Sequence, residues 1–218
     1  MLVGDGKANI GEFRDSLTGV KLGSIAEPIE VIPFHVEKFW DIQKDDGSGQ
    51  FQWDRSEPLN EDPVSPMYND NLPWMDKENG VDIKRIRRRN FYVLLPSEVA
   101  NDADVPYIFS FKSTSFKEGK KVYTQMYMRN RRAKLPPPGY SFKIGGIKTK
   151  NDKGTFIVPT VELGRTTTER EIKAALAWFK LIKQGGVKVD DSDVTGMTDA
   201  ADLVQDDKPF TADGTGSF

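Results

Sequence analysis

The chain of 218 residues contains no cysteine and a single histidine, His35. Without cysteine there is no disulfide framework, no thiolate metal site and no cysteine nucleophile. One histidine cannot build a zinc site of the usual kinds, so neither a metal nor another cofactor is expected. His35 lies between Phe34 and Val36 in a strand-like segment, which favours a structural role for it.

Long apolar runs and catalytic motifs are also missing. No stretch approaches 18 apolar residues, and residues 1–11 lack the apolar core of a secretory signal, so we expect a cytoplasmic protein with no membrane span. There is no P-loop, no Gly-x-Ser-x-Gly and no Ser-x-x-Lys motif. Paired acids such as Asp45-Asp46 and Glu61-Asp62 lie in turn-rich segments, where solvated loops explain them. We therefore expect no enzyme; a metal-dependent nuclease using these carboxylates is the enzymatic alternative.

Charge is distributed unevenly along the chain. The total is −2, but residues 1–83 carry −10, residues 84–150 carry +12, residues 151–188 carry +3 and residues 189–218 carry −7. A basic block inside an otherwise acidic chain suggests a polyanionic partner. The structural alternative is that these cations neutralise the acidic first third across the fold. That alternative does not readily explain the aromatic residues between the charges.

The last thirty residues, 189–218, form an acidic segment. They contain eight aspartates and one lysine, Lys208. We expect a disordered tail attached to a body, residues 1–188, with a net charge of +5. Such a tail can compete with a polyanion for the basic block, or recruit partner proteins while that block is occupied.

The body alternates short strand patterns with irregular connections. Residues 1–26 are an irregular lead-in. Residues 27–36 predict a strand that Pro33 restricts to an edge or a bulge. Residues 44–82 are rich in proline, glycine and paired acids, so a long loop or insertion is expected there. Further strands are predicted at 90–95, 105–111, 121–128, 140–147 and 155–163.

One helix is clearly marked at the end of the body. Thr168 and Glu171 have the spacing of a capping box, and Gly185-Gly186 supplies the stop. Apolar residues recur at helical spacing between them: Ile172, Ala175, Leu176, Phe179 and Ile182. Several short strands and one C-terminal helix fit a sandwich or a small barrel. We expect a mainly β, OB-fold-like small barrel over residues 1–188, followed by the tail.

The basic block interleaves cations with aromatic side chains. This combination is typical of single-stranded nucleic-acid binding, in which cations follow the phosphates and each base stacked on a ring contributes ~1–3 kcal/mol. On the predicted strand 121–128, Tyr123 and Tyr127 would share an outward face, about 13–14 Å apart. The alternative is that both tyrosines lie at core edges. The candidate phosphate-binding residues are Arg85, Arg87, Arg88, Arg89, Lys112, Lys120, Lys121, Arg129, Arg131 and Arg132. The candidate stacking residues are Phe116, Tyr123, Tyr127, Trp53 and Trp74.

The tail carries a motif that resembles a known family. Asp206-Asp207-Lys208-Pro209-Phe210 resembles the Asp-Asp-x-Pro-Phe tip of bacterial single-stranded-DNA-binding proteins. An acidic tail ending in an aromatic residue, here Phe218, is similar to phage replication proteins of that class. The resemblance implies an OB-fold body that coats single strands, and a tip that docks on replication and repair proteins or folds back onto the DNA groove. The bacterial motif ends the chain, whereas eight residues follow Phe210 here, so both phenylalanines are candidate anchors.

Together these patterns predict a sequence-tolerant, phage-type single-stranded-DNA-binding protein that acts in DNA replication, recombination or repair. Its partners would be single-stranded DNA and replication or repair proteins, with homo-oligomerisation as a further option. Two alternatives use the same features. One is a regulator that binds RNA or duplex DNA, and the other is a phage structural or assembly protein whose segregated charges drive self-association.

Overall fold

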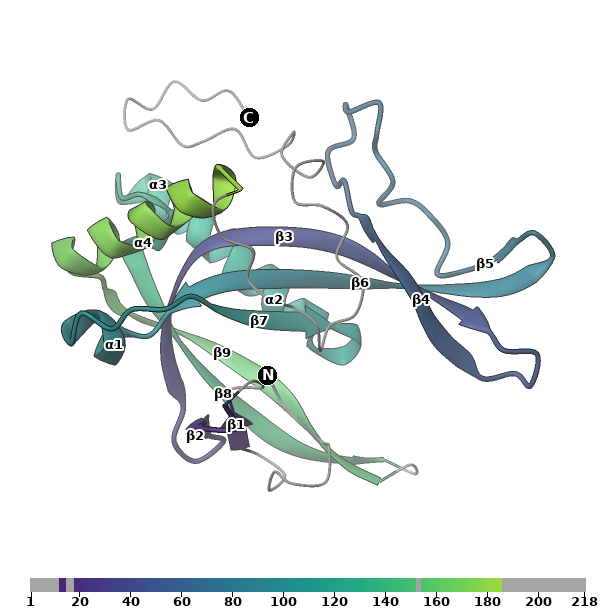
Figure 1. Ribbon diagram of the computed structural model, residues 1–218, viewed down its shortest axis with the longest axis horizontal. Helices are drawn as coiled ribbons and strands as arrows, with labels where there is room; N and C mark the ends of the chain where they lie inside the picture. Colours follow the sequence, from purple (N-terminus) through teal and green to yellow (C-terminus); the bar gives the residue numbers. More distant parts are fainter. Residues whose placement is uncertain (1–11, 15–17, 152–153, 186–218) are drawn as a thin grey trace.

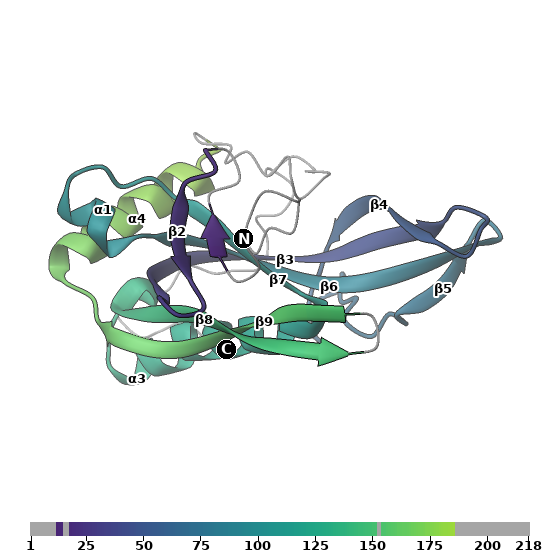
Figure 2. The same cartoon turned by 90° about the horizontal axis from the view of Figure 1, so that it is seen from below.

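Two long strands organise the computed structural model, which describes residues 12–14, 18–151 and 154–185 (Figure 1, Figure 2). β3 (Ile29–Asp45) and β6 (Val81–Leu94) are antiparallel and paired from Ile32 and Leu94 at one end to Lys44 and Ile83 at the other. A shift in register between Pro33 and His35 accommodates the proline as a bulge. Both strands far exceed the usual ~5–6 residues, so they run through two parts of the molecule.

The first part is the body, an antiparallel sheet in the order β7–β6–β3–β8–β9. β7 (Tyr107–Lys112) pairs with β6, β8 (Tyr140–Asn151) pairs with residues 29–31 of β3, and β9 (Gly154–Thr166) pairs with β8. The mainly β prediction is confirmed. The expected barrel is not closed, because the edge strands β7 and β9 are not paired within the described residues.

The second part is an arm formed by the far ends of β3 and β6 (Figure 1, right). β4 (Phe51–Pro58) pairs with β3, and β5 (Met75–Glu78) pairs with β6. The prediction of a long loop over residues 44–82 is therefore wrong for much of its length. Pro58 is the last residue of β4, and the other prolines that suggested a loop lie in the connection 59–74, which covers one face of the arm.

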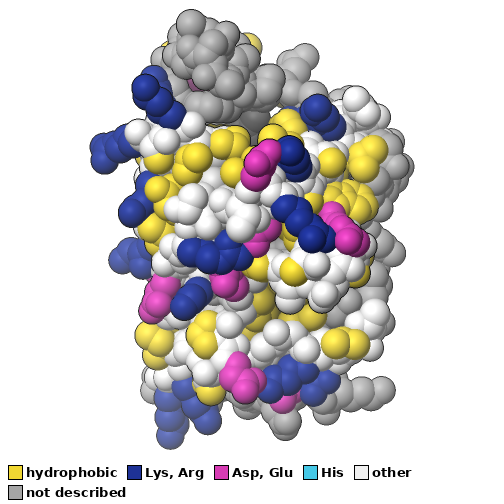
Figure 3. Space-filling view, turned by 90° about the vertical axis from the view of Figure 1, so that its left-hand side faces the viewer, with side chains coloured by type: hydrophobic (Ala, Val, Ile, Leu, Met, Phe, Trp, Pro, Cys, Tyr) yellow, Lys and Arg dark blue, Asp and Glu magenta, His cyan; other side chains and the backbone are white. Residues whose placement is uncertain are grey.

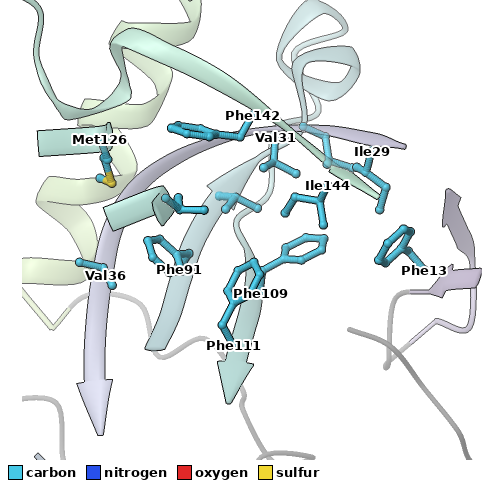
Figure 4. Close-up of a cluster of buried hydrophobic side chains, with 13 residues drawn as sticks. Phe13, Ile29, Val31, Val36, Phe91, Phe109, Phe111, Met126, Phe142 and Ile144 are labelled. Carbon is cyan, nitrogen blue, oxygen red and sulfur yellow. The ribbon is translucent and has the colours of Figure 1, made fainter. Parts of the chain in front are cut away.

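An unexpected helix covers one face of the body sheet. α2 (Phe116–Thr124) continues through the π-helical turn η2 (Gln125–Arg129) into α3 (Asn130–Arg132), so residues 116–132 form one helix. Val122 and Met126 are buried against Phe91, Phe111 and Phe142 in the main core (Figure 4). The predicted strand 121–128 is therefore wrong. Residues four apart share a face in a strand as well as in a helix, so the burial pattern of Val122 and Met126 fits both.

The opposite face of the sheet is covered by α4 (Glu169–Lys183) and α1 (Pro96–Ala100). Phe34, Tyr92 and Leu94 pack there against α4, and His35 lies between the rings of Tyr92 and Phe179. The structural interpretation of His35 agrees with this position. α4 begins as predicted, because the Thr168 side chain accepts a hydrogen bond from the Glu171 N–H and the Glu171 carboxylate accepts one from the Thr168 N–H.

Smaller elements complete the described chain. β1 (Glu12–Arg14) and β2 (Lys21–Ser24) form a two-stranded sheet in the expected irregular lead-in, and place Phe13 in the main core. η1 (Ser113–Ser115) and η3 (Pro137–Gly139) are short 3₁₀ turns. The acidic tail 189–218, with Asp206, Asp207, Pro209, Phe210 and Phe218, lies outside the described residues.

The start of α4 depends on a buried carboxylate. Arg165 donates two hydrogen bonds to Glu171, 2.9 Å to Oε2 and 2.6 Å to Oε1, which with the Thr168 bonds lower the pKa of Glu171 to about 2. The stabilisation is therefore complete above the ordinary pKa of 4.5 and is lost as the pH falls toward 2. Glu171→Gln should lower the free energy of unfolding at pH 7 by about 1–3 kcal/mol in urea denaturation.

The difference between wild type and Glu171→Gln should shrink between pH 5 and pH 2, because in that range the unfolded chain binds a proton at Glu171 while the folded chain, with its lower pKa, still keeps the carboxylate ionised. Glu169→Gln is the matched control, since Glu169 is exposed on the same helical turn and should change stability by less than about 0.5 kcal/mol. A difference that stays constant down to pH 2 would contradict the assigned role of the Glu171 charge.

Candidate nucleic-acid interface

The arginine run lies inside β6, not before it, and strand alternation divides it between the two faces of the sheet. Arg85, Arg87 and Arg89 share the face that carries α2 and the connection 59–74. Arg88 points to the opposite face. The four arginines lie within five residues of one another in the sequence. The fold nevertheless separates them, because Arg88 lies on the opposite face of the sheet from the other three.

Each of the three arginines on the α2 face pairs with an acid from the arm, an arrangement that we call the arginine ladder. Arg85 Nη1 lies 2.8 Å from Asp76 Oδ2, and Arg87 Nη2 lies 2.8 Å from Asp70 Oδ1. Arg89 pairs with Glu61. The acids come from the first third of the chain, so this part of the basic block fits the structural alternative of neutralisation across the fold.

Arg89 is also enclosed by aromatic rings that were candidate base-stacking residues. Its side chain is 1% exposed, and its Cζ lies 4.8 Å from the ring centre of Phe116 and 5.0 Å from that of Tyr123. Lys38 lies 4.4 Å from the Tyr123 ring and donates a 3.2 Å hydrogen bond to its hydroxyl. Phe116 and Tyr123 thus bind cations of the protein itself.

Tyr123 and Tyr127 do share a face, but on a helix. Their ring centres are 4.8 Å apart, much closer than the strand geometry predicted, because residues four apart on a helix are neighbours. Both side chains are half-buried. They form a compact pair at the edge of the main core, which agrees with the alternative interpretation of these tyrosines.

The other side of the arm and of the adjoining part of β6 presents a surface that we call the distal sheet face. It comprises Gln43, Trp53, Met75, Lys84, Ile86, Arg88 and Lys112. Lys84 is paired with Gln43 on one side and with Met75 on the other, and Gln43 is paired with Trp53. Because directly paired residues lie on the same face, the surface extends across all four strands of the arm.

A buried polar network lies at the inner end of this face. Arg88, 2% exposed, donates from Nε to Asp41 Oδ1 at 3.1 Å and from Nη2 to Ser56 Oγ at 3.1 Å. Ser56 in turn donates to Asp41 at 2.8 Å, and the Arg88 guanidinium lies 4.8 Å from the Phe39 ring centre. Arg88 therefore ties β3, β4 and β6 together beneath the surface.

Exposed indoles and cations surround that network. Trp53 is 37% exposed and Trp74, which directly precedes β5, is 65% exposed. Lys84 Nζ lies 6.0 Å from the Trp74 ring centre. Lys112, paired with Arg88 at the end of β7, is exposed. Rings available for stacking beside cations available for phosphates are what single-stranded nucleic acid requires.

The remaining candidates lie on helix 116–132 and are Lys120, Lys121, Arg129, Arg131 and Arg132. With Lys117 and with Lys134, which lies just after the helix, they form an exposed set that we call the basic ridge. Lys121 pairs with Glu118 at 2.6 Å, and Arg129 lies 5.3 Å from the Tyr140 ring centre. Figure 3, which views the body end, shows lysine and arginine side chains gathered along one margin of the surface.

Sequence reasoning missed the acidic partners of the arginines. Glu61, Asp70 and Asp76 lie in the segment 44–82, for which the sequence predicts a loop or insertion, and Asp41 lies just before it. The signal for them was the net charge of −10 in residues 1–83, which a compact fold must place near cations. Lys84 belongs to the basic block 84–150, but the alternation that places it on the distal sheet face depends on the register of β6.

Comparisons of the chain with protein-family models, with curated proteins and with solved structures found no match. In the described ranges, no group of three or more histidine, aspartate and glutamate side chains is placed to hold a metal ion. Nor does any helix of those ranges have the length and apolar character needed to cross a bilayer. Function is therefore inferred from the distal sheet face and from the lysine and arginine residues exposed on helix 116–132.

The enclosed position of Arg89 predicts that lysine cannot replace it. Arg89→Lys should lower the free energy of unfolding by about 1–3 kcal/mol in urea denaturation, because an ammonium group cannot stack flat between two rings. Lys120→Arg, an exchange of the same kind on the exposed ridge, should change stability by less than about 0.5 kcal/mol. Equal stability of Arg89→Lys and the wild type would show that the ring contacts contribute little.

Proposed function

We propose that the protein binds single-stranded DNA without sequence preference and protects it during DNA replication, recombination or repair. The observation that carries this proposal is the order of the strands. In the chain the body runs β3, β6, β7, α2, β8 and β9, and in space the strands are ordered β7–β6–β3–β8–β9. This arrangement supports an open, OB-fold-like body, with α2 between its third and fourth strands.

The strand order supports one particular surface as the binding site. OB-folds bind oligonucleotides on the face of their second and third strands and with the loops after the first and fourth strands. The second and third strands here would be β6 and β7. The loop after the first strand would be the arm, and the loop after the fourth strand would be the turn between β8 and β9. The distal sheet face lies on β6 and continues onto the arm.

The side chains of that face would supply both kinds of contact. Lys84 and Lys112 would approach phosphates, and Trp53 and Trp74 would stack on bases. Arg85, Arg87 and Arg89 would support the arm from behind through the arginine ladder. A binding surface of this kind needs no catalytic group, and the proposal contains no chemical step.

The acidic tail would act on the same surface. Residues 189–218 carry −7 and are tethered beside a block of +12, so the tail would compete with nucleic acid for the cations. Its Asp206-Asp207-Lys208-Pro209-Phe210 sequence and Phe218 would dock on replication or repair proteins when DNA displaces it. A phage origin fits the resemblance of this tail.

Binding of an oligo-dT strand, followed by fluorescence titration across a salt series, tests the proposal. Trp53→Ala should weaken binding by about 5- to 100-fold, which corresponds to the loss of one stacked base. Val64→Ala, which shortens an exposed apolar residue elsewhere on the arm, should leave the affinity unchanged. Affinity should fall steeply with salt.

If oligo-dT shows no detectable binding at low salt, the proposal is wrong. Duplex DNA and RNA of the same length serve as competitors. A preference for either would favour the second candidate function, a regulator that binds RNA or duplex DNA. The basic ridge is the observation that supports this candidate, because cations without exposed aromatic rings do not select single strands.

Deleting residues 189–218 should tighten binding of the same oligonucleotide, because a tethered polyanion is removed. The gain should be largest at low salt and should fade as salt rises, since screening weakens both interactions. Asp206→Asn/Asp207→Asn in the full chain reports the contribution of the tip alone. Identical affinities for the full and shortened chains at every salt concentration would contradict competition by the tail.

A further inference from the structure

The basic ridge concentrates exposed cations on one helix of the described chain. Residues 116–134 contain seven cations and a single acid, Glu118. The arginine ladder, in contrast, has one carboxylate for each guanidinium. The helical part of the ridge, 17 residues at ~1.5 Å each, extends for about 25 Å with cations near both ends.

The ridge and the distal sheet face lie on opposite sides of the sheet. The inner side of the helix packs on Phe91 through Val122 and Met126. The neighbours of Phe91 in β6, Asn90 and Tyr92, point to the other side, as do Arg88 and Lys84 at the same two-residue period. Figure 2 agrees, because it shows α4 on one side of β3 and β6 and α3 on the other.

This separation allows both surfaces to be charged and occupied at once. A helix is ~10 Å across, and the thickness of the sheet adds to that distance. The resulting separation exceeds the Debye length of ~8 Å at physiological salt. Phosphates bound on one surface would therefore repel phosphates on the other only weakly, and binding at the two surfaces would be nearly independent.

We propose that the ridge binds a second nucleic-acid strand through its phosphates while the distal sheet face binds the first, so that one molecule bridges two strands. The proposal rests on the proposed function for the first strand. The ridge offers cations near both ends but no fully exposed ring, because Tyr123 and Tyr127 are half-buried. It would therefore bind the second strand by charge alone, and more sensitively to salt than the distal face does.

A bridging assay tests this inference with the full chain. Donor- and acceptor-labelled oligo-dT strands cannot pair with each other, so energy transfer between them reports a protein that holds both. The ridge variant Lys120→Glu/Arg132→Glu should keep its affinity for one oligo-dT strand within about threefold but reduce the transfer signal about tenfold or more. The control Lys173→Glu/Lys180→Glu, which makes the same change of charge on exposed positions of α4, should leave both readings unchanged.

Three outcomes would overturn the inference. The ridge variant could bridge as well as the wild type, or it could lose single-strand binding in parallel, which would make the ridge part of the first site. It could also lose bridging together with self-association in sedimentation, which would make the ridge a protein-docking surface. Failure of the proposed function is a separate result, because then oligo-dT would not bind the wild type at all.

Discussion

The antiparallel pairing of β3 with β6 is the interaction on which the rest of the structure depends. It is the only pairing in the described chain that takes part in both the body and the arm, and every other strand of the large sheet is attached to it directly or through β8. Its alternation assigns each side chain of β6 to one of two faces. The main core, the arginine ladder and the distal sheet face are all consequences of that single register.

The arrangement of the charges explains how a chain of net charge −2 can present a basic ridge on its surface. The acids of the first third return to β6 and neutralise Arg85, Arg87, Arg88 and Arg89. The cations of residues 116–134 meet only Glu118 within their own segment. The arginines of β6 therefore follow the interpretation of neutralisation across the fold, and the exposed cations of residues 116–134 are the part of the block to which the polyanion hypothesis still applies.

Local signals predicted the elements that depend on local chemistry. The start of α4 follows from Thr168 and Glu171, which have the spacing of a capping box. The helix at 116–132 was not predicted because its buried residues Val122 and Met126 are four apart, and residues four apart share a face both in a helix and in a strand. The ion-pair partners of the arginines could not be predicted, because they depend on the register between strands that are distant in the sequence. Residue types alone do not specify that register.

The arm has a mechanical consequence. Because β3 and β6 pass from the body into it without interruption, there is no linker at which it could swing as a separate unit. Any displacement of its tip must bend or twist the paired strands, and the load would travel along their hydrogen bonds into the main core. The arm should therefore bend and twist elastically as a continuous β-ribbon, and it should not rotate as a rigid unit about a hinge.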